Sequence, residues 1–194
     1  MRIKKISSIT IIVLLFVIGM SNSCKKEISK DIISELKNTT IIIQTDSLEA
    51  LVPINNNSTY CNQSNDPDYK YIIYVDTAQC APCKLHELVI WQSIINHSKD
   101  IGLKVNYYII FHPPKEQVPI LRKSYFDRRI NLPIYIDSIG IMERQNPIIK
   151  KGTYYHAFII DKDSHISAIG NAGEDAKIER KYYDFLRKAA TKKE

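Results

Sequence analysis

From residue 69 onward, apolar runs alternate with longer amphipathic segments. Residues 71–75 (YIIYV) are continuously apolar, as expected of a strand that is covered on both faces. Residues 82–98 follow with apolar side chains at helical spacing, namely Leu85, Leu88, Val89, Trp91 and Ile95. The same reasoning predicts strands at 105–111, 133–137, 157–161 and 165–170, and helices at 115–128, 139–145 and 174–190.

The chain before residue 69 is more polar and less regular. Residues 40–44 (TIIIQ) are β-branched and short, which favours a strand, and 55–68 form a turn-rich polar stretch that favours a surface loop. Residues 24–40 read as a tether, with a short helix at 28–36. The order of strands and helices predicts an α/β sandwich with a mixed central sheet over residues 41–194.

Composition and charge narrow the class of protein. The 194 residues are 44% apolar and 25% charged, which is typical of a folded chain. Three of the 27 basic residues (Arg2, Lys4 and Lys5) lie in the first 23 positions, which hold no acid, so 24 basic and 21 acidic residues remain. This bias is too weak to indicate a nucleic-acid partner. We also expect no cofactor and no resident metal ion.

The N-terminus has the pattern of an export signal. Three positive charges precede the 12-residue apolar run 9–20, and Ser23 and Cys24 follow it. Twelve residues rise only ~18 Å as a helix, short of the ~30 Å hydrocarbon core of a bilayer. The segment resembles a bacterial lipoprotein signal at 1–23, in which Cys24 becomes the lipid-modified first residue. Lys25 in place of Asp favours the outer membrane, so we expect a lipid-anchored protein of the cell envelope.

The pair Cys80 and Cys83 carries the candidate chemistry. The sequence Cys-Ala-Pro-Cys lies five residues beyond an apolar strand and opens a helix, where Pro82 is well tolerated. Unpaired backbone N–H groups and the helix dipole favour a thiolate there, and can lower a cysteine pKa from ~8.5 to between ~3.5 and ~7.5. We therefore expect Cys80 to be the attacking nucleophile and Cys83 to be the more buried resolving thiol. We expect the side chain of Lys84 mainly to extend into solvent.

Other uses of the pair are weaker. A structural zinc site needs four ligands, and only Cys61 and the helical His86 are near candidates. Covalent haem needs His directly after the second cysteine, where Lys84 stands. A purely structural disulfide stays open, although this spacing is poor at joining distant segments. Cys61 lies in the polar loop with no cation beside it, so we expect it to take no part in the chemistry.

Two segments carry a resemblance to a known family. Residues 71–88 (YIIYVDTAQCAPCKLHEL) and 157–170 (AFIIDKDSHISAIG) resemble the thioredoxin-like fold of membrane-tethered TlpA/ResA-type thiol–disulfide oxidoreductases. The resemblance extends in architecture over residues 40–190. It implies a three-layer sandwich around a mixed sheet and exchange with protein thiols and disulfides in the periplasm or at the cell surface.

Two positions depart from the family pattern. Tyr155 stands where the family has a cis-proline that helps to receive the substrate, and Tyr74 stands where an acid is often found, six residues before the first cysteine. A non-proline cis bond costs about 3–4 kcal/mol, so we expect the loop at Tyr155 to be trans or remodelled.

These departures leave two alternatives to thiol–disulfide exchange. One is a binding or copper-delivery protein in which His156 joins Cys80 and Cys83 as a ligand for Cu(I), or acts as a general base. The other is a peroxiredoxin-like peroxidase, because Thr77 and Cys80 reproduce its T-x-x-C motif without the preceding proline.

Overall fold

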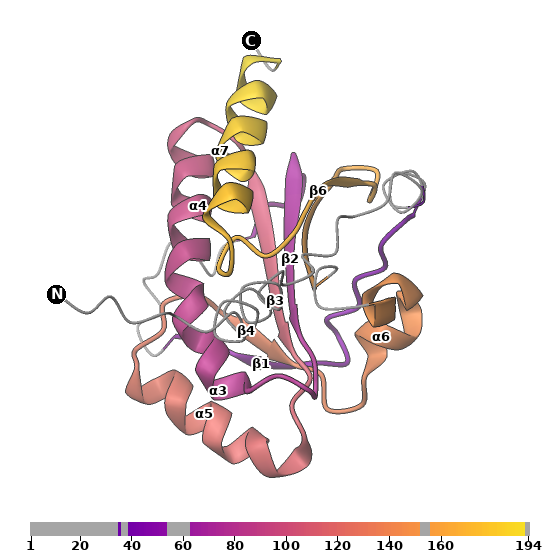
Figure 1. Cartoon of the computed structure of the whole chain (residues 1–194), viewed down its shortest axis with the longest axis vertical. Coiled ribbons are helices and arrows are strands. Elements are labelled where there is room, and N and C mark those ends of the chain that lie inside the picture. The colour runs from indigo at the N-terminus through magenta and orange to yellow at the C-terminus, as the bar shows by residue number, and fades with distance from the viewer. Residues whose placement is uncertain (1–34, 36–38, 54–62, 152–155, 193–194) are drawn as a thin grey trace, which may run out of the picture. The chain divides into compact units, whose positions relative to one another are not determined.

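A six-stranded mixed sheet forms the centre of the molecule (Figure 1). In chain order its strands are β1 (Glu49–Leu51), β2 (Tyr69–Val75), β3 (Val105–Phe111), β4 (Ile134–Ile136), β5 (Ala157–Asp161) and β6 (Ile166–Ile169). They lie in the order β1-β4-β3-β2-β5-β6. The β2–β3 and β3–β4 pairs are parallel, whereas β1–β4, β2–β5 and β5–β6 are antiparallel. The predicted α/β class with a mixed sheet is confirmed.

The computed structural model describes residues 35, 39–53, 63–151 and 156–192. These residues belong to one unit that begins at Glu35. The predicted signal at 1–23, the helix at 28–36 apart from Glu35, and Cys24 and Cys61 all lie outside the described residues. No helix within the described ranges has the length and apolar character needed to cross a membrane.

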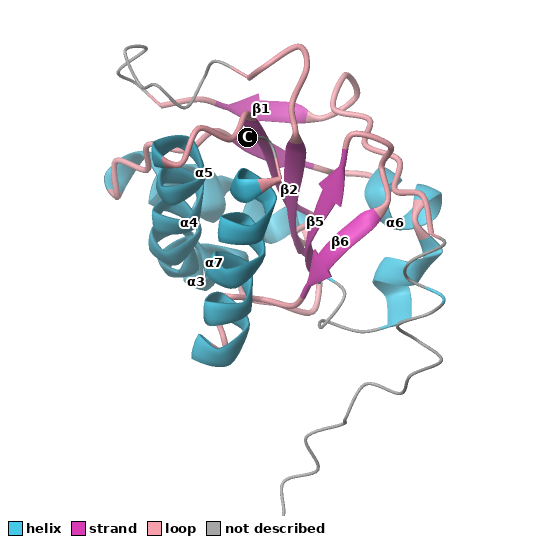
Figure 2. Cartoon of the chain, turned by 90° about the horizontal axis from the view of Figure 1, so that it is seen from above, coloured by secondary structure: helices cyan, strands magenta, loops and turns pink. Residues whose placement is uncertain are grey.

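Helices cover both faces of the sheet. They are α3 (Ala81–Lys84), α4 (Leu88–Asp100), α5 (Val118–Asp127), α6 (Ile141–Gln145) and α7 (Ala176–Thr191). Short 3₁₀ turns add Leu85–Glu87 between α3 and α4, Lys115–Gln117 before α5, and Pro147–Lys151 after α6. Figure 2 shows α3, α4, α5 and α7 on one side of the sheet and α6 on the other. The result is the three-layer sandwich that the sequence predicts.

The larger core lies between the sheet and the α4–α7 layer. Trp91 of α4 is fully buried, and its ring meets Tyr182 of α7 edge-on with 5.4 Å between ring centroids. Alternate residues of β2, Tyr71, Ile73 and Val75, face this core. Val89, which the helical pattern places in the core, is instead 70% exposed. The core therefore fixes β2 and α4, the two elements that flank the cysteine pair.

The chain before β2 differs from the prediction. Residues 40–44 form no strand: Thr40 makes only an isolated bridge to His165. The backbone of Ile42 instead bonds the side chain of Asn146, which accepts from its N–H at 2.8 Å and donates to its carbonyl at 2.8 Å. One edge strand of the sheet, β1, begins a few residues later. The predicted strand at 40–44 is therefore wrong, because a side-chain amide and not a neighbouring strand bonds the backbone of Ile42.

Candidate functional site

The cysteine pair lies directly after β2, in the turn that opens the helical layer. Asp76 shapes this turn: its carboxylate accepts from the N–H of Ala78 at 3.0 Å, and its own N–H donates to the side chain of Gln79 at 3.2 Å. Cys80 then caps α3 in an extended conformation, and Pro82 occupies the first turn of the helix. The strand–turn–helix context predicted for the pair is confirmed.

The two cysteines form a disulfide across the first turn of α3. Their Cα atoms are 5.2 Å apart, and the N–H groups of Cys83 and Lys84 both donate to the carbonyl of Cys80 at 3.0 and 3.1 Å. Both cysteines are exposed. The expectation that Cys83 is the more buried of the two stays a prediction, because both cysteines reach the surface. A partner has access to either residue.

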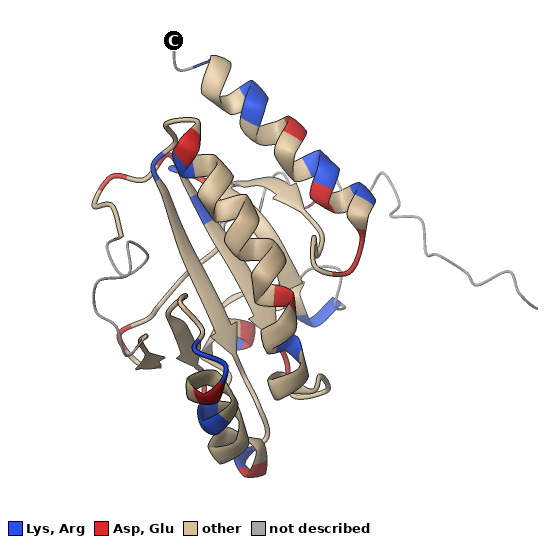
Figure 3. Ribbon diagram, turned by 90° about the vertical axis from the view of Figure 1, so that its left-hand side faces the viewer, with Lys and Arg blue, Asp and Glu red and all other residues tan. Residues whose placement is uncertain are grey.

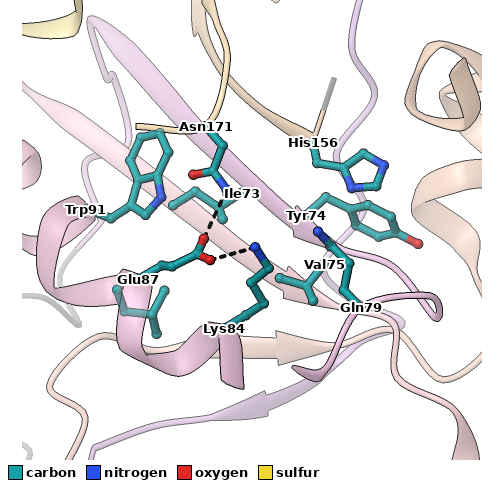
Figure 4. A pocket seen from close by; sticks show the side chains of 10 residues that line it. Ile73, Tyr74, Val75, Gln79, Lys84, Glu87, Trp91, His156 and Asn171 are labelled. Carbon is teal, nitrogen blue, oxygen red and sulfur yellow. Dashed lines mark hydrogen bonds and ion pairs between the residues drawn. The ribbon is translucent and has the colours of Figure 1, made fainter. Parts of the chain in front are cut away.

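Lys84, next to the disulfide, forms ion pairs with two carboxylates and does not simply extend into solvent. Its Nζ lies 2.6 Å from Glu87 Oε1 and 2.5 Å from Glu174 Oε1. Asn171 donates to the other oxygen of Glu87 at 3.0 Å, so that Lys84 and Asn171 approach Glu87 from different sides (Figure 4). We call Lys84, Glu87, Asn171 and Glu174 the lysine cluster. The helical residues 81–100, made of α3, the 3₁₀ turn Leu85–Glu87 and α4, are called the active-site helix below. The lysine cluster ties this helix to the loop between β6 and α7.

Two further observations, one steric and one electrostatic, support this cluster. A Cβ at Gly173 would come within 2.9 Å of Glu87 Cβ and 3.0 Å of its carboxylate, so only glycine lets the loop approach this closely. Burial lowers the pKa of Lys84, but the hydrogen bonds to Glu174 and Glu87 more than offset it, and the net pKa is raised. Lys84 therefore stays charged, with that charge committed to carboxylates.

Tyr74 lies on the other face of β2 from this cluster. Its hydroxyl donates to Glu143 at 2.8 Å and lies 3.0 Å from His112 Nδ1. Burial, followed by the bond to Glu143 and its charge, raises the pKa of Tyr74. The phenol at the position where an acid is often found is therefore neutral and serves as a hydrogen-bond donor, not a base.

His156 is also buried on this side, with only 4% of its surface exposed. Its Nε2 lies 3.2 Å from the carbonyl of Ile149, which can only accept, and 3.9 Å from Asp76 Oδ2. Its ring meets Tyr74 edge-on, and Figure 4 shows it beside Tyr74 and away from Glu87 and Trp91. Burial lowers the pKa of His156, although the charge of Asp76 and the bond to Ile149 partly oppose this. The imidazole is thus neutral, with its proton on Nε2.

The copper site of the alternative interpretation is not seen among the described residues of this disulfide-bonded form. Among the described residues, the only three His, Cys, Asp or Glu side chains close enough to share a metal ion are Asp161, Asp163 and His165, at the exposed β5–β6 turn. His156 is therefore not gathered with Cys80 and Cys83. The side chains that line the small cavity at the end of β2 leave room for about one water molecule, with an interior volume of about 10 Å³.

Several residues near the disulfide were not anticipated from the sequence. Glu87 lies three residues after Lys84, a spacing that favours an ion pair on a helix, and so was within reach of pattern analysis. Glu174 and Asn171 are more than 80 residues distant in the chain, and only the tertiary fold brings them to the site. Tyr155, the position of the missing proline, lies outside the described residues.

Comparison with known proteins identifies the fold. No protein-family model matches the sequence, and no curated protein matches it. A thioredoxin-like protein solved in its oxidised form is 15% identical, covers 79% of this chain and 98% of its own, and superposes with a TM-score of 0.51.

Two further structures superpose less closely. A thioredoxin-like protein from Porphyromonas gingivalis is 18% identical over 77% of this chain and 95% of its own, with a TM-score of 0.49. StoA from Bacillus subtilis is 17% identical over 68% and 96%, with a TM-score of 0.43. At such low identity the first superposition establishes the fold alone, which is thioredoxin-like as the sequence predicts.

Proposed function

We propose that this chain is a thiol–disulfide exchange protein that acts on protein cysteines through Cys80 and Cys83. The observation that carries the proposal is the exposed Cys80–Cys83 disulfide at the start of the helical layer of a thioredoxin-like fold. The turn before it is braced by Asp76, and Ala81, between the two cysteines, is buried in the core. Such a site holds the disulfide at the surface, where a partner cysteine can reach it.

The exchange proceeds in two steps, each of which forms one bond to sulfur and breaks another. In the reducing direction, the Cys80 thiolate attacks one sulfur of a partner disulfide, the partner S–S bond breaks, and the released partner thiolate takes up a proton. The Cys83 thiolate then attacks Cys80 in the mixed disulfide, releasing the second partner thiol and restoring the Cys80–Cys83 bond. The oxidising direction is the reverse, and the relative reduction potentials of the two proteins select between them.

The experiment that tests these roles is mixed-disulfide trapping. In a Cys61→Ser background, Cys83→Ser should accumulate a covalent adduct with a disulfide-bearing peptide, because Cys83 is no longer there to resolve it. Cys80→Ser is the matched control and should accumulate at least ten-fold less. An equal yield from both variants would show that Cys83, which is also exposed, attacks as readily, and the assignment of the nucleophile would be wrong.

We also propose that the protein is anchored in the cell envelope through a lipid on Cys24. The support is the charged and apolar pattern of residues 1–23 followed by Cys24. An acyl anchor would keep the redox domain outside the reducing cytoplasm. A disulfide persists in such an oxidising compartment. Expression of the full chain in a bacterium should place it in the membrane fraction, and Cys24→Ala should release it. Retention of the Cys24→Ala variant in that fraction would contradict the anchor.

A further inference from the structure

An exposed ridge runs from the disulfide along the active-site helix. Cys83, His86 and Val89 are all exposed, and they follow one another at a spacing of three residues. Residues three apart on a helix are neighbours on its surface. The ridge therefore continues outward from the second sulfur and ends on Val89, whose side chain is 70% exposed.

Helix α5 lies beside this ridge. The Gln117 side chain at the start of α5 accepts from the N–H of Ala81 at 3.4 Å, and Arg128 at its end donates to His86 Nε2 at 2.5 Å. Figure 1 shows α3 and α5 as neighbours at the base of the molecule. One end of α5 is thus tied to α3, and the other to the 3₁₀ turn that follows α3.

Most of α5 is not buried. Only Leu121 and Tyr125 of its ten residues are buried, while Ile120 is 55% and Phe126 is 40% exposed. Across the described chain, six large apolar side chains are exposed, and three of them (Val89, Ile120 and Phe126) lie on α5 or on the ridge. Val89 lies on α4, and Ile120 and Phe126 lie on α5, so exposed apolar side chains occur on both helical segments next to the disulfide, as they do at interaction sites.

The charge of this region is strongly positive. Residues 115–129 contain two acidic residues, Glu116 and Asp127, and five basic ones, Lys115, Arg122, Lys123, Arg128 and Arg129. Arg122 is paired with Glu49 of β1 at 2.5 Å. Figure 3 shows the basic segments along α5, the helix at the bottom of the molecule. These 15 residues carry a net charge of +3, as much as residues 24–194 carry together.

We infer that α5 and the Cys83–His86–Val89 ridge dock an acidic polypeptide segment that flanks the substrate cysteines. The inference rests on the proposed exchange function and names the class of partner. The exposed Val89 and Phe126 favour a polypeptide with some apolar side chains, and the cations of residues 115–129 favour carboxylates. Such complementarity raises the rate of encounter more than the affinity, and is reduced by salt.

The test uses the full chain in its reduced form and three peptides with the same central disulfide. Their flanking residues are three Glu, three Gln or three Lys, and the rate constant of mixed-disulfide formation is measured in the Cys83→Ser, Cys61→Ser background. At low salt the Glu peptide should react about ten-fold faster than the Gln peptide, and the Lys peptide more slowly than either. This advantage should shrink at 1 M salt, where the screening length is about 3 Å.

A pair of charge-reversal variants locates the effect. Lys115→Glu with Lys123→Glu should remove most of the preference for the Glu peptide. The matched control, Lys181→Glu with Lys188→Glu on the exposed side of α7, changes the net charge equally and should keep it. Loss of the preference in both variants would show that net charge alone is responsible, and would overturn the inference.

The remaining outcomes separate the inference from the function on which it rests. If all three peptides react equally, exchange stands but the docking surface does not. If none reacts, both are wrong. Binding of the full chain to phosphatidylcholine vesicles that contain about one third phosphatidylglycerol, lost in Lys115→Glu with Lys123→Glu while the peptide rates stay equal, would assign α5 to a membrane surface instead.

Discussion

Polar side chains on the two faces of the sheet are held in different ways at the end of β2. On the helical face, Lys84, Glu87 and Glu174 form ion pairs with their side chains 19%, 24% and 44% exposed. On the opposite face, Tyr74 and Asp137 are at most 2% exposed and depend on hydrogen bonds. Lys84 of the first group directly follows Cys83 in the chain, whereas the second group bonds to α6.

This difference indicates a division of tasks. Ion pairs at partly exposed positions contribute about 0–1 kcal/mol each, so the lysine cluster adjusts the surroundings of the disulfide at little cost to stability. Hydrogen bonds to a buried carboxylate contribute about 1.5–3 kcal/mol, so the opposite face stabilises the connection between β4 and α6. Changes on the two faces should therefore affect different measurements.

The largest effect is expected for Asp137→Ala. Asp137 is fully buried, and its carboxylate accepts from the N–H groups of Ile141 and Met142 at the start of α6, both at 2.9 Å. Losing both bonds should lower the free energy of unfolding by roughly 3–5 kcal/mol in urea denaturation. The reduction potential of the folded protein should not change. A cost below about 1 kcal/mol would contradict the importance given to this face.

Tyr74→Phe should have a smaller effect of the same kind. It removes the hydroxyl that Glu143 and His112 share, and leaves those groups without that partner. The free energy of unfolding should fall by about 1–3 kcal/mol. The rate of thiol–disulfide exchange should stay within two-fold of the unmodified chain. A large loss of exchange at unchanged stability would show that the phenol takes part in the chemistry.

His156 should make stability depend on pH. Because burial lowers its folded-state pKa, the native state binds fewer protons than the unfolded state, whose histidine pKa is ~6.5. Its contribution is complete above pH ~6.5 and is lost as pH falls through the folded-state pKa. His156→Gln should therefore flatten the decline in unfolding free energy between about pH 7 and 5. His165→Gln, at an exposed position, is the control and should leave the decline unchanged.

Glu174→Gln should have the smallest effect on stability. It removes one of two carboxylates from Lys84 at a position that is 44% exposed, so the cost should stay below about 1 kcal/mol. Asp184→Asn, which removes the exposed pair with Arg187, is the matched control. A loss from Glu174→Gln as large as that from Tyr74→Phe would remove the contrast between the two faces.

The sequence predicts the frame of the molecule well because the frame depends on local pattern. The apolar run at 71–75 and the helical spacing after Pro82 predict β2 and the active-site helix, and the motif at Cys80 predicts where the disulfide forms. Contacts across the fold are less accessible. Nothing near residues 40–44 reveals that Asn146 satisfies the backbone of Ile42.

The immediate surroundings of the disulfide were the least predictable part. The exposure of Val89 and Cys83 depends on what packs against α3 and α4, which the helical pattern alone does not specify. Glu174 reaches Lys84 only because the β6–α7 loop returns to the active-site helix. His156, which one alternative interpretation placed beside the sulfurs as a third ligand, packs against Tyr74. A single sequence identifies the reactive pair but not the groups that surround it.

The most direct test of the exchange function is a redox titration of the full chain in the Cys61→Ser background. Samples equilibrated in thiol–disulfide buffers are alkylated, and the fraction of reduced Cys80 and Cys83 is measured by mass. We predict one two-electron transition with a midpoint between about −270 and −120 mV, the range of thioredoxin-like exchange proteins. A pair that stays oxidised below about −300 mV, as structural disulfides do, would contradict the proposed function.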